Sequence, residues 1–184
     1  MALPYLPLHN MSDRHQGLTP AVAESYLEAA RVTLSRHHES PQEFTLRKFF
    51  YESNEAFDIV VAWEPPDENC LRAWANHDDA TRDGAYACAI AAAELSLGLY
   101  AISRAETLTG ADYYVAPLGQ TIEDLESCFR LEVSGTNLDE SRVRRRLSEK
   151  VHQALEGRSN LPALAIVVGF RVKVIFTRFV EDQL

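Results

Sequence analysis

The stretch Asp83–Arg104 constrains the fold of this chain most strongly. It reads DGAYACAIAAAELSLGLYAISR, and alanine and leucine occupy the whole circumference of the helix that it predicts. A helix that is apolar on all sides is buried. Its run of small side chains also allows another backbone to approach closely. We therefore predict a central helix that packs on a sheet.

Several segments have the patterns expected of the strands in that sheet. Residues 163–170 read ALAIVVGF, a nearly continuous apolar run that is typical of a strand buried on both faces. Other segments alternate apolar and polar residues, which is typical of half-buried strands. The strands that we expect are 43–51, 57–64, 71–75, 109–117, 128–135, 163–170 and 170–179. The short linker 52–56 favours an antiparallel hairpin between the first two.

Two further helices are amphipathic. Thr19 and Pro20 are typical of a helix start, and an apolar stripe extends from there to about Arg36. A second stripe spans 141–155, and Gly157 follows it. Residues 1–18 lack any periodic pattern, so we interpret them as an arm, and residues 76–82 as a polar loop. His77, Asp78 and Asp79 in that loop fit either a turn with a helix cap or a metal site.

The chain therefore predicts one α+β domain in two parts. Residues 83–184 form the core, a mixed sheet flanked by helices. Residues 1–82 add the arm, a helix and a β-hairpin that pack on this core. The length of 184 residues is typical of one domain.

Charge and cysteine content limit the classes of function. The net charge of −9 argues against nonspecific DNA binding. Five basic residues and one acidic residue nevertheless lie between Arg142 and Lys150. The three cysteines are widely spaced and odd in number, which favours a reducing, cytoplasmic location. No segment resembles a secretory signal or a transmembrane span, so we expect no membrane association.

Acidic residues stand at three notable places. Asp112 lies near the start of the predicted strand 109–117. On strand 128–135, alternation places Arg130, Glu132 and Ser134 on one face and apolar residues on the other. Glu94 is the only carboxylate inside the apolar helix. A buried carboxylate is costly unless it is paired, so Glu94 belongs either to an active site or to a salt bridge.

This arrangement resembles the restriction-endonuclease-like, or PD-(D/E)XK, superfamily. The elements that carry the resemblance are a helix with a carboxylate, a strand with Asp, a strand with Glu-x-x, and a basic helix. The matching positions are Glu94, Asp112, Glu132 and Ser134. Ser134 stands where the superfamily has lysine and Ala111 where it has proline, so the chain resembles a degenerate member. The TGADYYV…RLEVSG pattern also resembles a bacterial family of unassigned activity.

The resemblance implies a site for Mg²⁺ or Mn²⁺ that hydrolyses phosphodiesters. Asp112, Glu132 and the backbone carbonyl of Val133 would hold the ion, and Glu94 would assist them. Because Ser134 supplies no cation, we expect Lys150 or Arg130 to do so. Lys150 and Gln153 share one helix face by their spacing. The candidate contacts to nucleic acid or to a protein partner are Arg130, Arg142, Arg145, Arg146 and Gln153.

Two functions remain open. The first is a metal-dependent nuclease, or a nuclease-fold subunit of a bacterial nucleic-acid-processing or defence system. The second is a catalytically inactive nuclease-like fold that acts as a scaffold or interaction subunit, which Ser134 and the acidic net charge favour. The sequence has no G-x-S-x-G, H-E-x-x-H, Walker-type or G-x-G-x-x-G motif.

Overall fold

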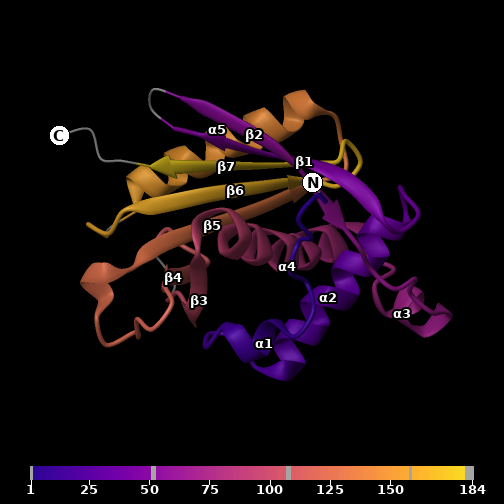
Figure 1. Cartoon of the computed structure of the whole chain (residues 1–184), viewed down its shortest axis with the longest axis horizontal. Coiled ribbons are helices and arrows are strands. Elements are labelled where there is room, and N and C mark those ends of the chain that lie inside the picture. The colour runs from indigo at the N-terminus through magenta and orange to yellow at the C-terminus, as the bar shows by residue number, and fades with distance from the viewer. Residues whose placement is uncertain (1, 51–52, 107–108, 158, 181–184) are drawn as a thin grey trace.

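The computed structural model of the protein describes residues 2–50, 53–106, 109–157 and 159–180. A seven-stranded mixed sheet with the order β2-β1-β7-β6-β5-β4-β3 forms its centre (Figure 1). The strands are β1 Gln42–Phe49, β2 Asn54–Val61, β3 Leu99–Arg104, β4 Tyr113–Pro117, β5 Phe129–Thr136, β6 Ala163–Gly169 and β7 Val174–Val180. The helices are α1 Met11–Arg14, α2 Pro20–Ser35, α3 Glu68–Ala73, α4 His77–Leu97 and α5 Glu140–Glu156, with the 3₁₀ turn η1 Leu125–Ser127.

Helices cover both faces of the sheet. α5 packs on β5, β6 and β7, whereas α4 packs on β3, β5 and β6 from the other side, and α2 packs on α4 (Figure 1). This is the mixed α+β fold, with a sheet flanked by helices, that the sequence predicts. β1 pairs with β7, so the N-terminal hairpin extends the same sheet as the C-terminal strands.

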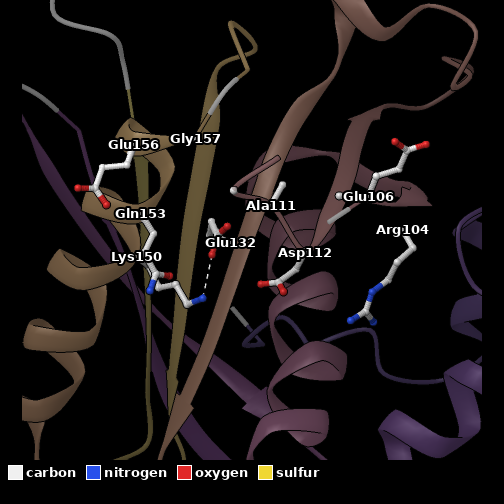
Figure 2. A pocket seen from close by; sticks show the side chains of 11 residues that line it. Arg104, Glu106, Ala111, Asp112, Glu132, Lys150, Gln153, Glu156 and Gly157 are labelled. Carbon is white, nitrogen blue, oxygen red and sulfur yellow. Dashed lines mark hydrogen bonds and ion pairs between the residues drawn. The ribbon is translucent and has the colours of Figure 1, made fainter. Parts of the chain in front are cut away.

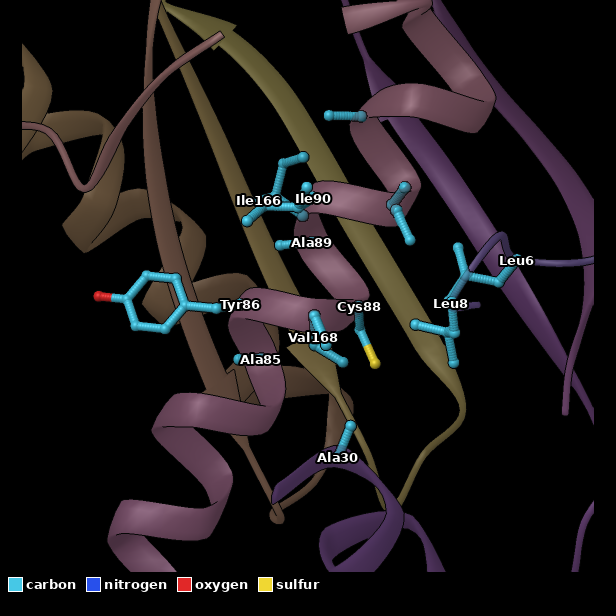
Figure 3. Close-up of a cluster of buried hydrophobic side chains, with 14 of the residues drawn as sticks. Leu6, Leu8, Ala30, Ala85, Tyr86, Cys88, Ala89, Ile90, Ile166 and Val168 are labelled. Atoms are coloured by element: carbon cyan, nitrogen blue, oxygen red, sulfur yellow. The ribbon is translucent and has the colours of Figure 1, made fainter. Parts of the chain in front are cut away.

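β6 shows why this sheet needs a layer on each face. Leu164, Ile166 and Val168 belong to the core beneath α4, whereas Ala165 and Val167 belong to the core beneath α5. Figure 3 shows Ile166 and Val168 beside Ala89 and Ile90 of α4. Burial on both faces, predicted for 163–170, is confirmed because every residue of β6 is buried.

The strand directions bring three connected strands together at one end of the sheet. β3, β4 and β5 pair antiparallel in sequence order, and α5 then returns the chain so that β6 pairs parallel to β5. The chain before β4 consequently lies beside the middle of β5. The backbone N–H of Asp112 donates to the carbonyl of Leu131 at 2.8 Å.

The central helix occupies different residues from those predicted. α4 begins at His77, because the side chain of Asn76 caps it by accepting from the backbone N–H groups of Asp78 and Asp79. It ends at Leu97, because Gly98 adopts a left-handed conformation with φ of 65°. Leu99–Arg104, predicted as helix, is β3. The prediction of a polar loop at 76–82 was therefore also wrong, whereas the helix-cap interpretation is confirmed.

Other boundaries agree more closely. Thr19 caps α2 by accepting from the N–H of Val22, as predicted, and α5 matches the predicted 141–155 helix within one residue at each end. The hairpin of β1 and β2 is antiparallel, as predicted. Its predicted strand end at Tyr51 and the start of its linker at Glu52 lie outside the described residues. The predicted strand 71–75 was wrong, since α3 occupies most of it after a cap by Asp67.

The N-terminal arm is packed against the rest of the molecule. Leu6, Leu8, Met11 and Leu18 are buried, and α1 lies within the segment that we predicted to be irregular. Leu6 and Leu8 lie at the edge of the main core (Figure 3). Among the described residues, no helix is both long and apolar enough to cross a lipid bilayer.

Candidate active site

A cleft of about 590 Å³ lies between the end of β3, the start of β4, β5 and the C-terminal half of α5. Figure 2 shows Lys150 and Gln153 on one side of this cleft and Arg104 on the other, with Glu132 and Asp112 between them. The ionisable side chains that line it are Arg104, Glu106, Asp112, Glu132, Lys150 and Glu156. The cleft therefore contains four carboxylates and two cations.

Asp112 is fixed by contacts through both carboxylate oxygens. Oδ1 accepts from the hydroxyl of Tyr86 on α4, and Oδ2 accepts from the backbone N–H of Val133, each at 2.8 Å. Asp112 precedes β4 by one residue and stands opposite Glu132, since Tyr113 pairs with Leu131. The two carboxylates thus come from β5 and from the residue that precedes its neighbour β4.

Glu132 forms the second acidic position. It is 4% exposed, and its Oε2 accepts from Nζ of Lys150 at 2.8 Å (Figure 2). Burial raises the pKa of Glu132 above its ordinary value, and Asp112 raises it further, whereas Lys150 opposes both effects. Lys150 therefore places a positive charge directly against this buried carboxylate.

Arg130 is buried at 3% exposure and positions the walls of this cleft. Its Nε donates to the carbonyl of Leu161 at 2.9 Å, and Nη1 donates to those of Ala154 and Thr109 at 3.0 and 3.2 Å. These bonds join the end of α5, the segment before β6 and the turn before Asp112. The structure thus gives Arg130 an interior role and not the contact surface that we predicted.

The turn that delivers Asp112 lies tightly against the end of α5. Gly110 has φ of 65°, and a Cβ added there would stand 3.1 Å from Cα of Gly157. Both the backbone conformation and the close approach favour glycine. The glycine of the TGAD sequence therefore allows the chain to pass close to the end of α5 before Asp112 enters the cleft.

Glu94 does not line the cleft. It follows Tyr86 by eight residues, which is about 12 Å along α4. Its two oxygens accept from Nε of Arg14 at 2.7 Å and from Nε2 of His15 at 2.9 Å. Of the two interpretations of Glu94, the structure matches the salt bridge, and the expected position facing Asp112 and Glu132 was wrong.

Of the remaining predicted residues, only Gln153 lines the cleft. Ser134 follows Glu132 on β5. Arg142 and Arg146 stand at helical spacing from Lys150, so the three cations share one face of α5. Arg145 lies on a different face, 69% exposed and paired with Glu149 at 3.0 Å. Within the described chain, no ion pair involves Arg142 or Arg146.

The donor set fits a hard divalent cation. Mg²⁺ prefers oxygen ligands and is commonly held by one or two carboxylates with water. Asp112 and Glu132 supply such carboxylates. The pairing of β4 with β5 ends at Tyr113 and Leu131, so the carbonyl of Val133 has no partner on β4. The N–H of the same residue donates to Asp112, which places this carbonyl on the side of β5 where Asp112 lies. Among the described residues, no three His, Cys, Asp or Glu side chains are placed so that together they could hold a metal ion.

Sequence reasoning missed two residues that shape this cleft, Arg104 and Tyr86. Arg104 was assigned to the end of a helix, and Tyr86 only to its buried circumference. A signal was present in Gly98, because a glycine near the end of an apolar helix is typical of a C-terminal cap. Ending the helix there places Arg104 on a strand that neighbours Asp112.

We compared the chain with protein-family models, curated proteins and solved structures, and no match was found.

Proposed function

We propose that this chain is a metal-dependent nuclease of restriction-endonuclease-like fold. Asp112, Glu132 and the carbonyl of Val133 hold Mg²⁺ or Mn²⁺. Lys150 supplies the positive charge that a lysine at the position of Ser134 supplies in the superfamily. The observation that carries this proposal is the contact of Lys150 Nζ with Glu132 Oε2 at 2.8 Å, in the same cleft as Asp112. Its setting would be a nucleic-acid-processing or defence system of a bacterial cytoplasm, which the three free thiols fit.

The order of elements supports the fold assignment. α4 precedes β3 and then β4, which begins just after Asp112; the neighbouring strand β5 carries Glu132, and α5, a helix with several arginines, follows. In this order α4, β4, β5 and α5 correspond to the elements of the resemblance. Glu94 is the exception, because its position on α4 serves the N-terminal arm.

The reaction is the hydrolysis of a phosphodiester. Water attacks phosphorus, one P–O bond to a sugar oxygen breaks, and the products are a phosphomonoester and a hydroxyl that receives the proton. A bound divalent cation supplies charge stabilisation and activates water. Lys150 opposes the rise in the pKa of Glu132 that burial causes, and it presents a cation to the charge that develops on the phosphate oxygens.

A second candidate, the catalytically inactive scaffold, has an observation of its own. Leu118, Ile122 and Leu125 are exposed on the β4–β5 loop, at 76%, 39% and 42%. Three large apolar side chains on one loop favour contact with a protein partner. Asp112 and Glu132 also have internal partners, as residues that only stabilise a fold would.

The experiment is a cleavage assay with single- and double-stranded DNA and RNA in Mg²⁺ and in Mn²⁺. We expect cleavage by the wild-type protein that disappears in EDTA, in Asp112→Asn and in Lys150→Met. Glu94→Gln is the matched control, because it alters a carboxylate outside the cleft and should leave cleavage intact. Intact substrates under all these conditions, with no metal binding by calorimetry, would favour the scaffold.

A further inference from the structure

Arg104 is a cation that enters the cleft opposite Lys150. Figure 2 shows it beyond Asp112, coming from the end of β3. Its guanidinium carbon lies 4.9 Å from the ring centroid of Tyr86 and 5.1 Å from that of Tyr113. Two aromatic rings at these distances hold a guanidinium by cation–π attraction.

Hydroxyl groups fix the orientation of Arg104. Its Nη1 donates to the hydroxyl of Tyr26 at 2.5 Å and, more weakly, to that of Tyr113 at 3.5 Å. The hydroxyls of Tyr26 and Tyr113 are themselves 2.8 Å apart. Tyr26 comes from α2, 78 residues before Arg104 in sequence, so tertiary packing brings it to this guanidinium. A planar group held in this way loses little further freedom when it binds a ligand.

The charge of Arg104 is not neutralised by its surroundings. In the part of the chain that the structure describes, Arg104 forms no ion pair, and its partners are phenol groups. Burial raises the pKa of Tyr26 and of Tyr86, so these phenols stay neutral at physiological pH. Lys150, in contrast, is paired with Glu132. Arg104 is therefore the cation lining the cleft whose charge remains available to a ligand.

The donors of Arg104 are also only partly used. Arginine has five N–H donors, and the bonds to the tyrosines involve Nη1 and one long contact of 3.5 Å from Nη2 to Tyr86. No hydrogen bond from Nε exists among the described residues. A fork with free N–H groups matches the oxygens of a phosphate group, which accept two parallel hydrogen bonds.

We propose that Arg104 forms a phosphate subsite that binds a second, uncleaved phosphate of the nucleic-acid strand whose scissile phosphate lies at Asp112 and Glu132. The proposal rests on the proposed function for the identity of the ligand. Tyr86 links the two positions, since its hydroxyl donates to Asp112 and its ring supports Arg104. Tyr26 is a positioning residue, because it holds Arg104 without lining the cleft.

The test measures binding of a short fluorescein-labelled DNA strand by fluorescence anisotropy in Ca²⁺, an ion that also takes oxygen ligands. Arg104→Met keeps contact with the tyrosine rings but removes the charge. We expect it to weaken binding about tenfold or more, and Arg104→Lys to weaken it less. Arg72→Gln on α3 is the control, an exposed arginine paired with Glu68 that should leave binding unchanged.

A set of strands, each with one phosphate replaced by a neutral methylphosphonate, locates the subsite. Replacement of the phosphate at one position should weaken binding by the wild-type protein. The same replacement should not weaken binding by Arg104→Met any further. Tyr26→Phe should weaken binding in the same direction while its melting temperature shows a folded protein. A folded Arg104→Met that binds like the wild type, or a wild type that binds no strand, would overturn the subsite.

The subsite and the nuclease proposal fail separately. Binding that depends on Arg104 in a protein that cleaves nothing in Mg²⁺ or Mn²⁺ sustains the subsite and overturns the nuclease. Cleavage that is intact in Arg104→Met, with an unchanged KM, overturns the subsite and sustains the nuclease. If both hold, Arg104→Met raises KM more than it lowers kcat.

Discussion

Lys150 of α5 donates to Glu132 of β5 at 2.8 Å, so a cation from a helix lies against a buried carboxylate of the sheet. Eighteen residues separate the pair in sequence, and α5 returns antiparallel to β5 to bring them together. Both side chains are mostly buried, at 22% and 6% exposure. The proposed function therefore depends on Lys150 more than on any other cation of the cleft.

The first prediction tests whether Lys150 acts as the replacement for a lysine at Ser134. Lys150→Met should lower the cleavage rate by about 10²–10³-fold, the effect of removing one group that stabilises the transition state. Ser134 stands two residues from Glu132 on the same face of β5, so Ser134→Lys in the Lys150→Met background should restore part of the rate. Single-turnover assays measure both. A double variant no faster than Lys150→Met would argue against this replacement.

The second prediction concerns pH and Glu132, whose folded-state pKa is raised above its ordinary value of 4.5 by burial. The folded protein therefore binds a proton more tightly than the unfolded chain, and stability falls as pH rises from 4.5 through the raised pKa. Glu132→Gln lacks this loss, so its free energy of unfolding relative to wild type should increase over that window. Urea titrations at several pH values measure it, and a constant difference would contradict the pKa direction.

The third prediction compares two leucines on α5. Leu147 is 6% exposed and packs in the core under the helix, whereas Leu155 is 48% exposed. Leu147→Ala should lower the free energy of unfolding by about 2–5 kcal/mol because it opens a cavity. Leu155→Ala, the same change on the same helix, should cost no more than about 0.5 kcal/mol. Equal losses in chemical denaturation would mean that α5 packs by another face.

The fourth prediction separates Glu94 from the cleft. Nδ1 of His15 accepts from the N–H of Ala101 at 3.0 Å, so Nε2 carries the proton that points to Glu94. Glu94→Gln weakens the contacts that attach the N-terminal arm to α4, and should lower stability by about 1–3 kcal/mol. Limited proteolysis should then cleave within residues 1–18 more readily. Loss of Mn²⁺ affinity in Glu94→Gln would instead mean that Glu94 takes part in metal binding.

Much of the fold follows from patterns that local physics determines. The unbroken apolar run of β6 implies a sheet covered on both faces, and Thr19 with Pro20 marks the start of α2. The limits of α4 were harder to predict, because Asn76 can equally begin a turn or a helix. The short strand β3 gains its stability from pairing with β4 and from the arm, whose Gly17 donates to Ala101. Neither contact is visible in a local window of sequence.

The site was predictable where alternation alone decides the side-chain direction. Glu132 and its separation from the apolar face of β5 follow from the period of a strand. The role of Arg130 did not follow, because its three carbonyl partners come from residues 109, 154 and 161. Arg104 and Tyr86 meet Asp112 only through tertiary packing. The spacing of charged residues within one strand therefore predicts the position of the carboxylate Glu132. It does not predict the partners of the cations Arg130 and Arg104, because those partners come from distant parts of the sequence.

Metal binding between Asp112 and Glu132 is tested most directly by a crystal structure of the protein grown with Mn²⁺, with anomalous diffraction data. We predict one strong anomalous peak between the carboxylates of Asp112 and Glu132, next to the carbonyl of Val133, and no such peak in crystals of Asp112→Asn. Crystals at saturating Mn²⁺ in which Lys150 still contacts Glu132 and no anomalous density appears between Asp112 and Glu132 would contradict this prediction.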